Sequence, residues 1–274
     1  MTNERSSQVK IDKGEVTLHV FTSPEVGERV NSLAVETPNA IVVIDVPLYK
    51  PFAEEFKSYL QSIGKPIDRL LITHAHPDHW FTLAHFRDYE SYAFQEAIDE
   101  MAFLKDIAVG YHTQIHPDLV PDEVALPSRT ASEGPLEIDG VTFVLSKVLD
   151  AEATATMVVE IPALDTLLPQ DLVYHGCHRY LATKTASGES SVTSWIEHLE
   201  EFKRRGYDLV VPGHGPPTDA SVFDENIEYL RFAREVLATA ETGEELVSRL
   251  KERYPDLGLE QVLTMSAVML YPQA

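Results

Sequence analysis

The feature that most constrains this chain is a cluster of three histidines and one aspartate placed directly after an apolar segment. Residues 67–73 have the composition of a buried strand, and the cluster that follows reads His74-Ala75-His76-Pro77-Asp78-His79. In an extended segment, residues two apart point the same way, so His74 and His76 can hold one ion between them. Asp78 and His79 follow a turn at Pro77 and can face a second point nearby. Imidazole and carboxylate suit zinc or iron, so we predict a metal site here.

The remaining chain alternates between strand and helix patterns. We expect strands at 15–21, 30–37, 40–46, 67–73, 136–138, 141–148, 154–161, 167–174 and 207–211. We expect helices at 52–63, 79–86, 93–109, 191–205, 222–239, 244–254 and 259–270. Residues 110–129 show little periodicity and four prolines or glycines, which predicts an excursion over the surface. Each half moves from strands to helix, which favours an α/β fold of two facing sheets with helices outside.

Two later residues are candidates to complete a pair of metal sites. His214 lies in the turn Pro212-Gly213-His214-Gly215 after a short buried strand, and the glycines permit a bend that points His214 inward. Asp171 lies within an otherwise apolar segment. Neither residue identifies a metal site by itself. Asp171 in particular could be a turn residue, which is the commoner role of an isolated aspartate.

The cluster resembles the H-x-H-x-D-H signature of the metallo-β-lactamase superfamily, and the resemblance extends over residues 15–214. It implies a four-layer αββα sandwich with the metals at one edge of the sheets. We expect one domain over 1–274, with 221–274 as a C-terminal helical extension. The resemblance implies these roles: His74 and His76 on the first metal, Asp78, His79 and His214 on the second, Asp171 bridging both, and Asp45 supporting the ligand loop.

One position departs from the family pattern. The family supplies a third histidine to the first metal, but no histidine lies between His116 and His175, and the matching turn 149–153 carries Glu152. Glu152 resembles the alkylsulfatase branch of the superfamily. With Asp78 and Asp171 it would set three negative charges against the four positive charges of two divalent ions. We expect zinc, with manganese or iron as alternatives favoured by oxygen ligands. Alternatively, Glu152 does not bind and the first site is weak or empty.

The segment after Asp171 and the rim of the site offer candidates for substrate contact. We expect His178 and Tyr180 to hydrogen-bond a substrate, and Arg179 to pair with an acid group. Trp80 is expected at the rim, together with Phe81, Tyr111 and His112. The lone Cys177 is not expected to act as a nucleophile.

The charge and hydropathy of the chain indicate which kinds of binding partner to expect. The formal net charge is −22 among 274 residues, which argues against binding nucleic acid or an anionic membrane surface. No apolar run resembles a signal peptide or a membrane span, so we expect a cytoplasmic protein acting on a small molecule. The apolar stripes of the C-terminal helices fit either packing on this chain or a homodimer interface.

Hydrolysis is the function that the resemblance favours. A metal-bound hydroxide, oriented by Asp78, would attack an ester, lactone, thioester or amide carbonyl. Two alternatives remain open at this point. One is an iron-dependent oxygenase or oxidoreductase on the same scaffold, and the other is a binding protein whose first metal site has decayed at Glu152.

Overall fold

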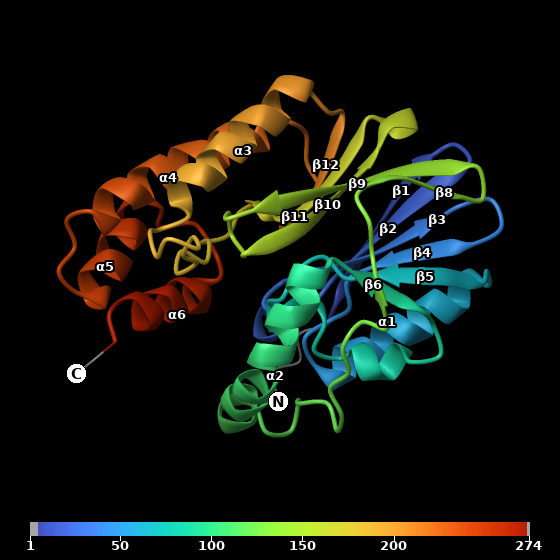
Figure 1. The fold of residues 1–274 in the computed structure, drawn as a ribbon, viewed down its shortest axis with the longest axis horizontal. Coiled ribbons are helices and arrows are strands. Elements are labelled where there is room, and N and C mark those ends of the chain that lie inside the picture. Colours follow the sequence, from blue (N-terminus) through green and yellow to red (C-terminus); the bar gives the residue numbers. More distant parts are fainter. Residues whose placement is uncertain (1–4, 273–274) are drawn as a thin grey trace.

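Two β-sheets face each other in a computed structural model that describes residues 5–272, with helices on both outer sides (Figure 1). The first sheet has the order β1 (Ser7–Lys13), β2 (Val16–Thr22), β3 (Asn31–Glu36), β4 (Ile41–Ile44), β5 (Ile67–Leu71), β6 (Ser91–Ala93) and β7 (Arg129–Thr130). The second has the order β12 (Leu209–His214), β11 (Thr166–Tyr174), β10 (Ala155–Ile161), β9 (Val141–Leu149) and β8 (Gly134–Ile138). This arrangement confirms the expected αββα sandwich.

Three apolar layers hold the sandwich together. Residues such as Leu33 and Phe143 fill the space between the sheets. Phe56 and Met101 lie on α1 (Lys50–Ile63) and α2 (Gln95–Ile115), which pack on the outer face of the first sheet. The helices that cover the second sheet are α3 (Val192–Arg205) and α4 (Val222–Leu237), where Trp195 is fully buried. Apolar burial on both faces of each sheet is what this layered architecture requires.

Parallel strand pairs bring distant parts of the chain to one edge. β4 pairs with β5 in parallel, with Ile44 opposite Leu71, so the segments that follow both strands leave the sheet together. β11 pairs with β12 in parallel, with Tyr174 opposite His214. A hydrogen bond of 2.8 Å from Met157 N to Thr73 O joins the two sheets at this edge.

The structure corrects several predicted elements. Residues 79–86 are not one helix: they form parts of two short 3₁₀ turns, η2 (Pro77–His79) and η3 (Leu83–Phe86), because the chain there is buried on several sides. α2 continues past Gly110 to Ile115, into the predicted excursion, where His112 Nδ1 lies 2.9 Å from Tyr49 Oη. The sequence pattern missed β1, β6 and β7; β1 is mostly exposed, and only Val9 and Ile11 on it are apolar.

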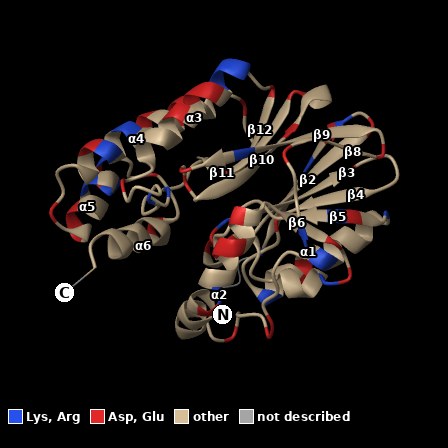
Figure 2. Ribbon diagram, in the orientation of Figure 1, with Lys and Arg blue, Asp and Glu red and all other residues tan. Residues whose placement is uncertain are grey.

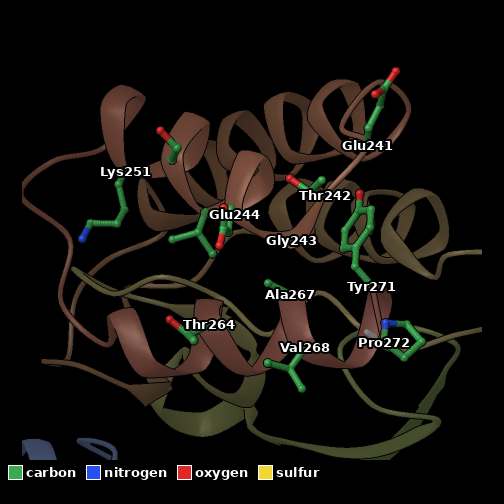
Figure 3. Close-up of a pocket in the computed structure, with 12 residues that line it drawn as sticks. Glu241, Thr242, Gly243, Glu244, Lys251, Thr264, Ala267, Val268, Tyr271 and Pro272 are labelled. Carbon is green, nitrogen blue, oxygen red and sulfur yellow. The ribbon is translucent and has the colours of Figure 1, made fainter. Parts of the chain in front are cut away.

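The C-terminal helices extend the outer layer of the second sheet. α5 (Gly243–Arg253) and α6 (Glu260–Leu270) pack through Leu246, Leu250 and Leu263 onto the core beneath α3 and α4. A groove of about 1140 Å³ lies between them, and Figure 3 shows Ala267 and Tyr271 on its walls. No histidine lines this groove.

Acidic residues are distributed over the helices of both outer layers, while the strands between them carry few charged residues (Figure 2). Within residues 5–272, no helix has the length and apolar character needed to cross a membrane.

Candidate metal centre

The candidate ligands come from five segments that meet where the sheets end. His74 and His76 follow β5, Asp78 and His79 lie in η2, Glu152 lies in the turn between β9 and β10, Asp171 lies in β11, and His214 ends β12. All are buried except His76, whose side chain is 21% exposed. The structure therefore brings together all seven residues that the sequence analysis named.

The first group of ligand atoms surrounds Glu152. Its Oε1 atom lies 3.2 Å from His76 Nδ1, and its Oε2 atom lies 3.8 Å from His74 Nε2. Asp171 Oδ2 is also 3.8 Å from His74 Nε2. One ligand atom from each of these four residues falls within 4.8 Å of the others. Glu152 thus lies beside His74 and His76, where the resemblance to the family placed the third ligand of the first metal.

The second group surrounds Asp78. Its Oδ2 atom lies 3.3 Å from His79 Nε2 and 3.2 Å from His214 Nε2. Asp171 contributes both oxygens, with Oδ1 3.1 Å from His79 Nε2 and Oδ2 3.0 Å from His214 Nε2. These four residues also have ligand atoms within 4.8 Å of one another. Asp171 belongs to both groups, as a bridging carboxylate must.

Unsatisfied polar atoms at the centre test whether the residues fit metal ions. Four buried atoms make no well-aligned hydrogen bond there, although His79 Nε2 and Asp171 Oδ1 lie 3.1 Å apart: His74 Nε2, His79 Nε2, Glu152 Oε2 and Asp171 Oδ1. An unpaired buried polar atom costs about 1–3 kcal/mol, and four around one point need a common explanation. Imidazole nitrogens and carboxylate oxygens are the donors that zinc, manganese and iron bind. The site therefore fits divalent cations.

Asp45 supports this centre from behind. Its Oδ1 accepts a hydrogen bond from Thr73 N at 2.8 Å, and its Oδ2 accepts one from Thr73 Oγ1 at 2.7 Å. Oδ2 also lies 2.7 Å from His79 Nδ1 and accepts from Gln170 Nε2 at 2.5 Å. Its backbone is left-handed, with φ 59°. Asp45 thus fixes the ring of His79 so that Nε2 faces the centre, which is how such partners orient metal-binding histidines.

Tyr174 is a residue of the site that the sequence analysis missed. Its hydroxyl lies within donating distance of Glu152 Oε1 at 3.0 Å and Asp171 Oδ2 at 2.9 Å, and its ring stacks on His214 with centroids 4.8 Å apart. Simple alternation in a strand would place Asp171 and Tyr174 on opposite faces. The pairing of β11 with β12 is irregular between Gln170 and Tyr174, and this bulge lets both face the centre.

The loop of His214 is held by the turn between β2 and β3. His214 Nδ1 lies 2.6 Å from Glu28 O, and the Asn31 amide donates to Pro212 O at 2.8 Å and to Gly215 O at 2.7 Å. Gly213 is required by the close approach of Asp171, because a Cβ at this position would lie 1.8 Å from Oδ1 of that residue.

Opposed charges shift the pKa values of the second group. Burial disfavours the charged imidazoles, yet Asp171 and Asp78 outweigh it and hold the pKa values of His79 and His214 well above the usual value. The same pairing keeps the carboxyl pKa values of Asp78 and Asp171 well below theirs, against the effect of burial.

The first group is electrostatically mixed. Burial and the neighbouring His79 push the pKa of His74 well below its usual value. Against its own burial, His76 is raised by Glu152 to a pKa of about 9. Burial raises the pKa of Glu152 itself. This group therefore holds one neutral histidine and one paired with the glutamate.

Trp80 and His178 do not lie where the sequence analysis expected substrate contacts, because both side chains are buried. Trp80 is fully buried in the core under α1 and α2, and its indole donates to Ala75 O at 2.8 Å. His178 is 1% exposed, and its Nδ1 lies 3.0 Å from the hydroxyl of Tyr229 on α4. Arg179 lies over the same Tyr229 ring, 4.2 Å from its centroid. Both residues are buried because they pack against core residues: Trp80 among the apolar side chains under α1 and α2, and His178 against Tyr229.

Tyr180 lies beside the first group of ligands, and its expected contact with a substrate stays a prediction. Its ring lies edge-on to His76, with centroids 5.1 Å apart, and its side chain is partly exposed. Tyr111 and His112 lie together on α2, with ring centroids 5.1 Å apart, although His112 itself is buried.

Comparison with known proteins agrees with this geometry. The model of the metallo-beta-lactamase superfamily matches residues 26–214. No curated protein matches the chain significantly. Among solved structures, a metallo-beta-lactamase from Pontibacter korlensis is 18% identical, with a TM-score of 0.61, over 83% of this chain and 99% of its own.

A second similar structure is the metallo-beta-lactamase FIM-1 from Pseudomonas aeruginosa in its mono-zinc form. It is 15% identical, with a TM-score of 0.61, over 85% of this chain and 98% of its own. A metallo-beta-lactamase from Hirschia baltica is 16% identical, with a TM-score of 0.56, over 83% and 98%. At these identities the likeness shows the fold, while the family match covers most of the chain. The H-x-H-x-D-H cluster, the sandwich and the family match together show that this chain belongs to the metallo-beta-lactamase superfamily.

Proposed function

We propose that this protein is a dinuclear metallohydrolase that cleaves an ester, lactone, thioester or amide bond in a small molecule. The observation that carries the proposal is the convergence of seven ligand residues on two overlapping groups that share Asp171. Four buried atoms at their centre that make no well-aligned hydrogen bond support metal binding. Zinc is the ion we expect, with manganese or iron as alternatives.

The residues would divide the work between the two groups. His74, His76 and Glu152 would hold one ion, Asp78, His79 and His214 the other, and Asp171 would bridge them. Bound divalent ions supply Lewis acidity and make water a nucleophile near neutral pH. Asp78 Oδ2 faces both His79 and His214, so Oδ1 would be left to orient the attacking water.

The surrounding residues would keep this arrangement fixed. Asp45 holds His79, and the Tyr174 hydroxyl contacts the two carboxylates Glu152 and Asp171, so neither half can move without disturbing the other. Preorganisation of this kind is a main source of catalytic power in polar sites. Tyr180, beside the partly exposed His76, would lie on the substrate side.

The test is elemental analysis of protein purified without added metal, together with a hydrolysis assay on a panel of esters, lactones, thioesters and amides. We expect close to two divalent ions per chain, turnover of at least one class, and loss of turnover after chelation with recovery on adding zinc. Stoichiometric iron with dioxygen uptake would favour the oxygenase instead. Metal binding without turnover of any class would favour a binding protein.

A further inference from the structure

The turn that carries Glu152 is held from behind by three hydroxyl groups. Three consecutive backbone oxygens of this turn each accept a hydrogen bond from a side chain: Asp150 O from Ser194 Oγ, Ala151 O from Ser191 Oγ, and Glu152 O from Thr183 Oγ1. We call Thr183, Ser191 and Ser194 the hydroxyl clamp. Its members lie 31, 40 and 44 positions further along the chain than the oxygens they bind, so tertiary packing brings them to the turn.

Burial makes these hydroxyl groups necessary to the turn. Inside the turn, Asp150 N donates to Thr154 O at 3.0 Å, and Ala151 N donates to Ala153 O at 3.2 Å. Ala151 and Glu152 are fully buried, so their backbone oxygens must find partners within the protein. A buried carbonyl without a partner costs about as much free energy as a lost hydrogen bond. The hydroxyl clamp supplies the partners that burial requires.

Ser191 bonds the turn instead of capping its own helix. It stands at the N-cap of α3, where a serine hydroxyl ordinarily accepts a hydrogen bond from an amide in the first turn of the helix. Within the described chain, its hydroxyl makes no capping bond and donates to Ala151 O at 2.5 Å. A contact across the fold has therefore replaced the usual local one.

The hydroxyl clamp is itself held in place. Ser191 N donates to Thr183 O at 3.1 Å, which joins two of its members. Two residues before Thr183, Leu181 N donates to Ser266 Oγ on α6 at 2.9 Å. Because the family match ends at residue 214, α6 lies outside it. The turn of Glu152 is thus supported in part by the C-terminal helices that this chain adds.

Glu152 needs such support more than its neighbours do. His74 and His76 follow directly on β5, which is paired with β4 and β6, whereas Glu152 lies in a turn. Its Oε1 atom lies 3.2 Å from His76 Nδ1 and 3.0 Å from the hydroxyl of Tyr174. Glutamate has more rotatable bonds than histidine, so holding its carboxylate at one place costs more conformational entropy. A fixed backbone limits the positions that this carboxylate can reach.

We infer that the hydroxyl clamp places Glu152 as the third ligand of the first metal, so that its three members are positioning residues. The inference rests on the metal sites of the proposed function. The clamp acts through the backbone of the turn. Loss of one of its hydroxyl groups should weaken the ion held by the first group of ligands and leave the ion of the second group unchanged.

The test is titration with zinc against a chelating indicator, which measures the affinity of each ion. Thr183→Val keeps the shape of the side chain but removes the hydroxyl, and one of the two affinities should fall by about 10–100-fold, as is usual for residues that support a ligand. Thr183→Ser keeps the hydroxyl and should bind both ions nearly as the parent does. Ser191→Ala should show the same selective loss as Thr183→Val. The matched control is Thr193→Val, which removes an exposed hydroxyl from α3 and should keep both affinities.

Two results would overturn the inference directly. One is the parent affinity for both ions in Thr183→Val and Ser191→Ala. The other is equal weakening of both ions, because a general loss of structure would explain it. Circular dichroism verifies that each variant is folded, and if Thr183→Val does not fold, Ser191→Ala decides.

Glu152→Ala and an activity assay separate this inference from the proposed function. If Glu152→Ala loses one ion while the clamp variants lose none, Glu152 is a ligand and only the inference fails. If Glu152→Ala binds both ions as the parent does, the ligand assignment and the inference fail together. If the clamp variants lose affinity as expected but no ester, lactone, thioester or amide is cleaved, the hydrolase proposal fails and the inference stands.

Discussion

The two halves of the metal centre differ in how their ligands are supported. We call His74, His76 and Glu152 the first half-site and Asp78, His79 and His214 the second half-site, with Asp171 shared. In the second, the outer nitrogen of each histidine has a partner outside the centre: Asp45 Oδ2 for His79 and Glu28 O for His214. In the first, only His74 has such a partner, Thr73 Oγ1 at 3.0 Å from its Nδ1, while His76 remains partly exposed and pairs with Glu152 itself. Both histidines of the second half-site are therefore held from outside the centre, whereas only one of the first is.

Because their ligands are held differently, the two half-sites should respond differently to substitution. The second half-site balances two histidines against Asp78 and Asp171, whose charges hold one another in place. In the first half-site, Glu152 is steadied by the hydroxyl of Tyr174, for which Asp171 competes. Changes in the shared residue should thus affect both ions, and changes in Glu152 only one.

The largest effect is expected for Gly213→Ala. The added Cβ would lie 1.8 Å from Asp171 Oδ1, so the shared carboxylate must move and both half-sites should lose their ion. The loss of metal affinity should exceed the 10–100-fold typical of residues that only support a ligand. Elemental analysis after dialysis, with circular dichroism to verify folding, measures this. Full metal content in the variant would refute the shared role of Asp171.

Gly110→Ala is the matched control for that substitution. Gly110 lies inside α2 with nothing within 4 Å of an added Cβ. The change should leave metal content unaltered and raise the free energy of unfolding by about 0.5–1 kcal/mol, because alanine favours helix over glycine.

The next largest effect is expected for Glu152→Ala, which should weaken metal binding at the first half-site only. The first half-site loses its carboxylate, and its affinity should fall by about 100-fold or more, while the second half-site keeps its ion. Metal content should drop from about two ions per chain to about one. Glu152→His should restore the second ion, since histidine is the ligand that the family pattern carries there. Unchanged affinity for two ions in Glu152→Ala would remove Glu152 from the ligand set.

The smallest effect is a difference in proton release. Metal-binding histidines must be neutral, yet the pKa values of His79 and His214 lie well above the usual value in the metal-free protein. At pH 7, both are therefore protonated before the ion binds. In Glu152→Ala, where only the second half-site is left, binding of one zinc ion should release about two protons. Its affinity should accordingly weaken as the pH falls.

Calorimetry in buffers of different ionisation enthalpy counts these protons. Removing one of the two histidines, as in His214→Ala on the same background, should reduce the release to about one proton per ion bound. Release of no protons in the Glu152→Ala background would contradict the charged state assigned to His79 and His214.

The sequence anticipated the parts of the fold that local patterns encode. Apolar segments such as 40–46 and 167–174 are strands, and the amphipathic segment 191–205 contains α3. Strand β1 was missed because it is mostly exposed and only Val9 and Ile11 on it are apolar. The helix predicted at 79–86 was wrong because tertiary burial there divides the chain into short 3₁₀ turns.

The candidate site, like the fold, was only partly predictable from the sequence. The chain itself determined that three histidines and an aspartate follow a buried strand, and that a glutamate stands in the turn where a histidine is usual. Only the tertiary structure decided which other residues reach that place. Tyr174 does so through a bulge in β11, and Glu28 through a left-handed turn whose backbone oxygen contacts His214, whereas Trp80 is buried in the core. The physical reason is that motif spacing reports directions within one segment, whereas distances between segments depend on how the strands pair and the layers pack.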